Sequence, residues 1–154
     1  MISEFENLEQ EEQNLLYNAP VLVAILVAGA DGKIDKSEMR EAISISGMKK
    51  IKARKHLLQY YNEVGKDFED KLKVGIAKYP SDIKERQDLI SKQLSGISTI
   101  LPKLNRRFAI TLYASLKDFA KRIAESSGGI LGYMSIGYEE SKLIDLKMIK
   151  DPSL

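Results

Sequence analysis

The sequence predicts an all-α fold. Apolar residues recur at intervals of three, four or seven positions over most of the chain, which is the spacing of one face of a helix. No stretch alternates apolar and polar residues over the length of a strand, and glycine and proline residues divide the chain into segments of helical length. Together these observations predict a bundle of about seven helices.

The first two predicted helices lie on either side of Pro20. Residues 1–18 are rich in glutamate and poor in apolar residues, which predicts an acidic N-terminal helix that packs lightly on the rest of the molecule. Proline fits the first turn of a helix, so we expect the first helix to end at Asn18 and Pro20 to begin the second. Residues 20–30 are apolar on every side, which is typical of a central helix.

The middle of the chain contains an amphipathic helix and then a much longer helical segment. Residues 35–46 carry apolar residues on one face, and Gly47 is expected to end their helix. Apolar residues recur at helical spacing throughout residues 49–79, which predicts one long helix. Gly65 and Gly75 are the positions at which this helix is expected to kink.

Three further helices are predicted in the C-terminal half. Asp82 followed by Glu85 is the pattern of a capping box, and the apolar stripe after it continues until Pro102 interrupts it. Residues 104–125 have the strongest helical pattern in the chain. Residues 138–150 are expected to form the last helix, which a short tail follows.

Length and composition are those of one globular domain, residues 1–154, with residues 151–154 as its tail. The chain has no cysteine and one histidine, which excludes disulfides, a cysteine nucleophile and a zinc site of nitrogen and sulfur ligands. A net charge of +2 does not favour specific binding to nucleic acid. The acidic N-terminus is not typical of a secretory signal, and no uncharged run reaches the roughly 20 apolar residues of a membrane span, so we expect a cytoplasmic protein.

Carboxylates gather in a short connection between the second and third predicted helices. Residues 30–38 read A-D-G-K-I-D-K-S-E, and the second half of a calcium-binding EF-hand loop has the related pattern D-G-x-I-D-x-x-E. The first half does not match, because valine and glycine stand where carboxylate ligands are needed. Asp31, Asp35 and Glu38 are therefore candidate ligands of a weak divalent-cation site, of the calcium or magnesium type, and not of a complete EF-hand.

The same residues also fit a purely structural interpretation. Gly32 can adopt the positive φ that a tight turn requires. Asp35 can cap the next helix, and Glu38 can reach back to the Asp35 amide to complete a capping box. The residues alone leave both the cation site and the structural turn open.

A weaker copy of this motif lies near the C-terminus. Residues 123–128 align with residues 27–32, although serine replaces the aspartate, and after an inserted segment Glu140 takes the place of Glu38. Two helix–turn–helix units with related turns predict a pseudo-symmetric bundle. If the two turns face each other, Glu140 can complete a cation site shared between them.

The acidic N-terminal segment, the apolar helix, the A-D-G-x-I-D-x-x-E motif and its second copy resemble the tellurite-resistance TerB-like family. The resemblance extends over about residues 15–149 and is tight at residues 30–38. It implies an all-helical domain of the kind associated with bacterial stress and metal-resistance systems, and a related domain occurs in membrane-anchored DnaJ-like co-chaperones. By this resemblance, four acidic side chains would form a metal-binding surface: Asp31, Asp35, Glu38 and Glu140.

These observations favour a protein that binds rather than catalyses. We expect a stress-response interaction module with a divalent cation as its cofactor and with protein partners, membrane-associated ones among them. No serine–histidine–aspartate or cysteine–histidine arrangement can be assembled around the single histidine, His56, for which a surface or half-buried role is expected. Two alternatives stay open, namely a metal-assisted enzyme that uses the same carboxylates and a structural interaction domain without metal. The sequence does not specify the oligomeric state.

Overall fold

The computed structural model describes residues 2–28, 52–126 and 143–154. Within these ranges the chain forms helices and connecting turns and no strand, which confirms the predicted all-α class. In chain order the elements are η1 (Ser3–Phe5), α1 (Gln10–Ala28), α3 (Lys52–Lys78), α4 (Ile83–Ser95), η2 (Gly96–Thr99), η3 (Leu101–Lys103) and α5 (Arg106–Ser126). The described ranges thus hold four α-helices. The helix expected at residues 35–46 lies outside them, so the total of about seven stays a prediction.

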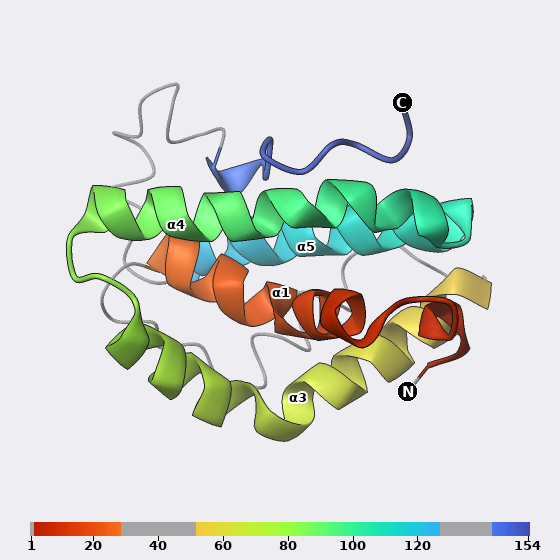
Figure 1. Ribbon diagram of the computed structural model, residues 1–154, viewed down its shortest axis with the longest axis horizontal. Helices are drawn as coiled ribbons and strands as arrows, with labels where there is room; N and C mark the ends of the chain where they lie inside the picture. The colour runs from red at the N-terminus through yellow and green to blue at the C-terminus, as the bar shows by residue number, and fades with distance from the viewer. Residues whose placement is uncertain (1, 29–51, 127–142) are drawn as a thin grey trace.

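α1 lies at the centre of the bundle. It packs against α3, α4 and α5, and Figure 1 shows it between α3 and α4 with α5 behind it. Each of residues 21–26 is at most 3% exposed. A helix that is apolar on every side is stable only when neighbours cover all of its faces. The prediction of a central helix in this part of the sequence is confirmed.

Pro20 lies inside α1, so the helix end predicted at Asn18 is wrong. A proline has no N–H to donate to the carbonyl four residues before it, here the carbonyl of Leu16. The hydroxyl of Tyr60, on α3, donates a hydrogen bond to this carbonyl instead. Because Tyr60 and Leu16 are fully buried, this bond satisfies a carbonyl that would otherwise be unpaired in the core, and the helix continues.

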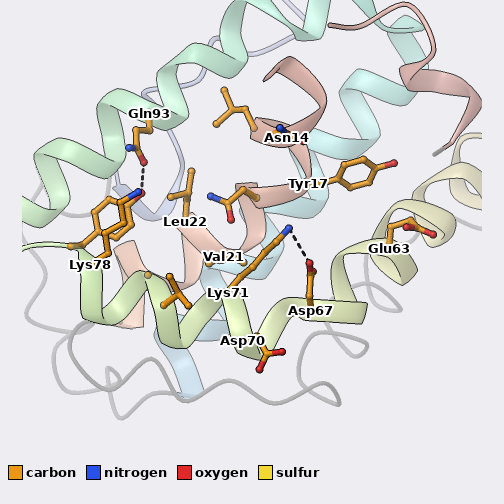
Figure 2. Close-up of a pocket in the computed structure, with 15 residues that line it drawn as sticks. Asn14, Tyr17, Val21, Leu22, Glu63, Asp67, Asp70, Lys71, Lys78 and Gln93 are labelled. Carbon is orange, nitrogen blue, oxygen red and sulfur yellow. Dashed lines mark hydrogen bonds and ion pairs between the residues drawn. The ribbon is translucent and has the colours of Figure 1, made fainter. Parts of the chain in front are cut away.

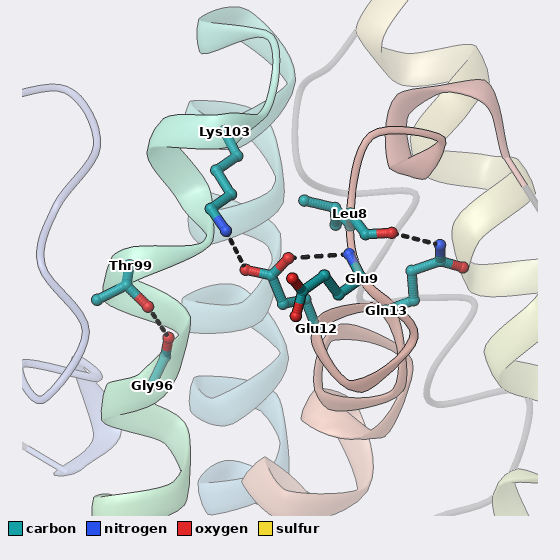
Figure 3. A network of polar contacts seen from close by, with 7 residues as sticks. All are labelled: Leu8, Glu9, Glu12, Gln13, Gly96, Thr99 and Lys103. Carbon is teal, nitrogen blue, oxygen red and sulfur yellow. Dashed lines mark hydrogen bonds and ion pairs between the residues drawn. The ribbon is translucent and has the colours of Figure 1, made fainter.

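The beginning of α1 also differs from the acidic helix predicted at residues 1–18. η1 and a short turn come first, and α1 begins at Gln10. The Glu12 carboxylate accepts a hydrogen bond from the backbone N–H of Glu9 at 2.9 Å and one from the Lys103 ammonium at 2.6 Å (Figure 3). The hydrogen bond from Lys103 lowers the pKa of Glu12. The contact with Glu9 is one half of a capping box, which fixes where the helix starts.

The N-terminal segment packs into the core, so the predicted light packing is wrong. Phe5 is 0% exposed and Leu8 is 6% exposed. The Phe5 ring makes edge contacts with the rings of Tyr17, Tyr60 and Phe108, with centroid distances of 5.1, 5.9 and 6.0 Å. The segment has few apolar residues, but Phe5 reaches between α1, α3 and α5.

α3 is one long helix with a kink. The kink lies at Asp67, whose φ of −133° and ψ of 19° are not helical, two residues after the predicted kink at Gly65. Gly75 lies inside the helix, so the second predicted kink is wrong. A Cβ atom at Gly75 would lie 2.5 Å from Cδ1 of Ile25. This glycine therefore permits the close approach of α3 to α1.

The start of α4 and the apolar face of α5 agree with the prediction. The Asp82 carboxylate accepts a hydrogen bond from the Glu85 N–H at 2.9 Å, which confirms the predicted N-terminal cap of α4. α4 ends at Ser95, before the predicted interruption at Pro102; η2 and η3 follow it, and Pro102 lies inside η3. α5 presents a fully buried apolar face made of Phe108, Leu112, Leu116, Phe119 and Ile123.

The predicted last helix, residues 138–150, is wrong at its C-terminal end. Residues 145–148 form turns, and Leu146 has a φ of 51°, which a continuing right-handed helix does not allow. The Tyr113 hydroxyl donates a hydrogen bond to the Leu146 carbonyl at 3.1 Å and so holds this turn against α5. Residues 138–142 lie outside the described ranges.

Tyr60 and Tyr61 lead us to expect a loss of stability at high pH. Burial raises the pKa of both phenols in the folded state. In the unfolded chain a tyrosine ionises near pH 10, so the stability from these groups is complete below about pH 10. Above it, stability falls by up to about 1.4 kcal/mol per pH unit for each tyrosine, until the pH passes the raised folded-state pKa values.

Urea denaturation at several values between about pH 9 and 11 measures this effect. Tyr61→Phe is expected to make the alkaline loss less steep. Its ring stays in place, and the Ser115 hydroxyl that faces Tyr61 keeps its bond to the Leu112 carbonyl. Identical slopes for the variant and the wild type would contradict the assignment to Tyr61.

Candidate functional site

The C-terminal ends of α1 and α5 define the first candidate site. The two helices pack against each other and run in the same direction, so both end at the same end of the bundle (Figure 1). Their starts are also held together, because Lys103, just before α5, pairs with Glu12 in the first turn of α1. The last described residues of the two helices are Ala28 in α1 and Ser126 in α5, and in the sequence each is followed by residues of one of the two related motifs.

The electrostatics of this end of the bundle favour a cation. The last carbonyl groups of a helix carry partial negative charge, which basic side chains in the last turn commonly offset. Neither α1 nor α5 has a basic residue in its last turn. Because α1 and α5 run in the same direction, their carbonyl groups point toward the same side of the molecule.

The four predicted ligands, Asp31, Asp35, Glu38 and Glu140, lie outside the residues that the structure describes. Among residues 2–28, 52–126 and 143–154, no group of three or more histidine, cysteine, aspartate or glutamate side chains is arranged to hold a metal ion. The structure therefore brings together the two helices that lead into the motifs. The ligand set itself stays a prediction.

His56 connects the N-terminal segment to α3. Its Nδ1 atom lies 2.7 Å from Oε1 of Glu4, and the two side chains are 14% and 16% exposed. This geometry agrees with the half-buried role expected for the lone histidine. This interaction between His56 and Glu4 adds a polar contact beside the aromatic packing of Phe5.

A groove that the sequence analysis did not predict lies between α1, α3 and α4 (Figure 2). Its volume is about 990 Å³, at the upper end of the range for small-molecule pockets. Val21 and Leu22 of α1 form its apolar base, and both are almost completely buried. Val74 of α3 lies at its edge with 64% of its surface exposed, so the groove is open to solvent there.

Acidic side chains of α3 line one wall of the groove. Glu63, Asp67 and Asp70 lie there, and Lys71 Nζ is 3.4 Å from Asp67 Oδ2 (Figure 2). Lys66 donates a hydrogen bond to Glu63 at 2.7 Å and lowers the pKa of that carboxyl group. Both ion pairs are exposed, and pairs of this kind contribute little to stability. Lys78 also lines the groove, so its α3 side carries both acidic and basic side chains.

Carboxamide side chains line the α1 and α4 sides of the groove. Asn14 and Asn18 lie one helical turn apart on α1, and Gln93 of α4 accepts a hydrogen bond from the Tyr79 hydroxyl. Asn14 uses its oxygen to accept a hydrogen bond from Gln10. The nitrogen of Asn14 and the whole carboxamide of Asn18 have no partner among the described residues. These groups can pair with a bound molecule.

The sequence did contain a signal for this wall. Positions 63, 67 and 70 are separated by four and three residues, which places three acidic side chains on one face of a helix. What the sequence could not show is that this face borders α1, because the α1 residues of the groove are more than 40 positions away along the chain.

No protein-family model, curated protein or solved structure matches the chain. The resemblance to the TerB-like family therefore rests on sequence features alone: the acidic N-terminal segment, the apolar helix, residues 30–38 and their second copy. Within the described part of the chain, no helix has both the length and the apolar character needed to cross a membrane.

Proposed function

We propose that the protein is a non-enzymatic, TerB-like interaction module of a stress-response system. Its acidic turn at residues 30–38 binds a divalent cation, and the bound cation fixes a surface that a protein partner recognises. The observation that carries this proposal is the packing of α1 against α5 in the same direction, since these are the two helices that precede the related motifs in the sequence.

Two physical arguments support a cation at this place. The aligned C-terminal ends of the two helices favour positive charge, and no basic residue in their last turns offsets that preference. In the sequence, Asp31 follows Ala28, the last described residue of α1, by three positions. Oxygen ligands of this kind suit calcium or magnesium, and water can complete a shell that the protein leaves incomplete.

α1 also links the proposed cation site to the groove. The helix that enters the acidic turn is the same helix that forms the base of the groove through Val21 and Leu22. Fixing the turn would fix the end of α1 and hence the groove beside it. A bound cation can thus tune a binding surface without taking part in any reaction.

The test is an amide NMR titration of the metal-stripped protein with calcium, magnesium and manganese. Saturable shifts, or manganese broadening, are expected at residues 30–38, and a response near Glu140 would indicate a shared site. Asp31→Asn is expected to weaken cation binding about tenfold or more while the fold is kept, because it removes one charged ligand. Asp88→Asn, an exposed aspartate of α4, is the matched control.

Two outcomes would decide against this function. No response at millimolar cation would remove the cation from the proposal. If Asp31→Asn only lowered the melting temperature, with no metal effect in either protein, the turn would have the structural capping role. A metal-assisted enzyme using the same carboxylates would instead need turnover that Asp31→Asn abolishes.

A further inference from the structure

We propose that Arg86, a buried arginine of α4, opposes divalent-cation binding at the acidic turn and so sets the affinity of the proposed site. This inference deepens the proposed function and rests on it for the cation. Its structural basis lies in described residues of α1 and α4. Arg86 is in this sense a residue that tunes the affinity of the site and not a ligand of the metal.

Arg86 is buried without an acidic partner among the described residues. Only 6% of its surface is exposed, whereas arginine is rarely buried unless it is paired. Its Nη1 atom donates a hydrogen bond to the Ser81 carbonyl across 3.4 Å, which is long for such a bond. Its Nε atom is buried and has no hydrogen-bond partner. The fold therefore holds a positive charge that no described carboxylate neutralises.

The register of α4 against α1 places Arg86 opposite the last described turn of α1. The two helices pack against each other and run in opposite directions (Figure 1). Gly96, directly after α4, lies beside Leu15, because a Cβ atom at Gly96 would be 3.3 Å from Cδ2 of Leu15. Arg86 comes ten residues before Gly96, and Ile25 comes ten residues after Leu15. Since both helices rise about 1.5 Å per residue, Arg86 lies near Ile25, three residues before Ala28.

The charge of Arg86 lies on the side of α4 that faces the bundle. Arg86, Ile90 and Leu94 are the buried residues of α4, and they recur at intervals of four, which is one face of a helix. The carbonyl groups of α1 and α5 point toward the end of the bundle at which α4 begins (Figure 1). Positive charge is favourable at such an end. Arg86 thus supplies, from a third helix, part of the positive charge that the last turns of α1 and α5 lack.

A resident guanidinium and a bound cation compete at this end of the bundle. Both are favoured by the same helix ends, and like charges repel each other more strongly where the protein excludes water and salt. A guanidinium also pairs readily with carboxylates, the groups that a calcium or magnesium ion needs as ligands. Both effects lower the affinity for the cation. Removal of the charge at position 86 is therefore expected to tighten cation binding about tenfold.

The experiment is an NMR titration with calcium of the 154-residue chain and its charge variants. Arg86→Met removes the charge, keeps a long side chain, and is expected to bind calcium about tenfold more tightly than the wild type. Arg86→Lys keeps the charge and is expected to keep the wild-type affinity within about twofold. Lys84→Met is the matched control, because Lys84 is an exposed residue in the first turn of α4. Water and salt screen its charge, so its loss should change the affinity by less than about twofold.

A second measurement tests the position of Arg86. The Nε–H group of an arginine gives its own NMR signal, and the loss of that signal in Arg86→Lys identifies it. Manganese bound at the acidic turn is expected to broaden the Arg86 signal. It should leave the signal of Arg107 sharp, because α5 begins at the opposite end of the bundle (Figure 1). Circular dichroism checks the fold of each variant, and Arg86→Gln takes the place of Arg86→Met if the latter does not fold.

The outcomes separate this inference from the proposed function. If the wild type binds calcium and Arg86→Met binds it equally or more weakly, the inference is overturned and the cation site stands. An equal gain in Lys84→Met, or bound manganese that leaves the Arg86 signal sharp, would also overturn the inference alone. If Arg86→Met binds calcium at concentrations to which the wild type does not respond, the inference stands and the cation leaves the proposed function. No response in any of these proteins would remove both.

Discussion

Replacement of Phe5 by alanine is expected to lower the free energy of unfolding by about 3–5 kcal/mol, the usual cost of removing a large aromatic side chain from a core. Phe5 is completely buried and touches the rings of Tyr17, Tyr60 and Phe108. These rings come from α1, α3 and α5, so the cavity would open where three helices meet. Edge contacts between rings add to the loss from burial alone.

Urea denaturation followed by circular dichroism measures this change. Glu6→Ala is the matched control, because Glu6 is the exposed neighbour of Phe5, and its substitution is expected to change stability by less than about 0.5 kcal/mol. A loss below about 1 kcal/mol for Phe5→Ala would mean that the N-terminal segment detaches before the bundle unfolds. In that case Phe5 would not be part of the global core.

The burial of Phe5 shows a limit of predicting the core from local sequence patterns. Periodicity counts apolar residues, and Phe5 and Leu8 are too few to form a stripe of their own. Their burial depends on a gap between helices that are separated by many positions in the chain. Long-range packing of this kind produces no periodic pattern of apolar residues in the sequence. For this reason the segment was expected to pack only weakly on the surface.

Elements determined by local chemistry were predicted well. The cap of α4 needs only Asp82 and the N–H of Glu85, three residues apart, and it was found as expected. The buried face of α5 and the apolar stretch of α1 follow from composition and spacing alone. The kink of α3 was placed two residues early, since glycine marks a weak point in a helix but does not fix where the backbone bends.

The two sites differ in what sequence can reveal. The acidic turn is a contiguous motif, so residues 30–38 can be recognised without a structure, although its ligands lie outside the described residues. The groove joins Asn14 and Asn18 of α1 to Asp67 of α3, and no contiguous motif contains them. Only the packing of the helices brings these groups together.

The second large effect concerns the proline inside α1. Tyr60→Phe keeps the ring and its contacts with the neighbouring aromatic residues but removes the hydroxyl that donates to the Leu16 carbonyl. Since Pro20 has no N–H to offer, this carbonyl would be buried without a partner. An unsatisfied buried acceptor costs about 1–3 kcal/mol, and we expect the free energy of unfolding to fall by that amount.

A double-mutant cycle with Pro20→Ala tests this explanation directly. An alanine at position 20 restores the N–H that can donate to the Leu16 carbonyl, so in that background Tyr60→Phe should cost less than about 1 kcal/mol. The two substitutions are thus expected to couple, although they lie on different helices. Equal costs of Tyr60→Phe in both backgrounds would show that the hydroxyl does not replace the missing backbone bond. Strong coupling would show that α1 continues past Pro20 because the Tyr60 hydroxyl, on α3, replaces the backbone N–H that the proline lacks.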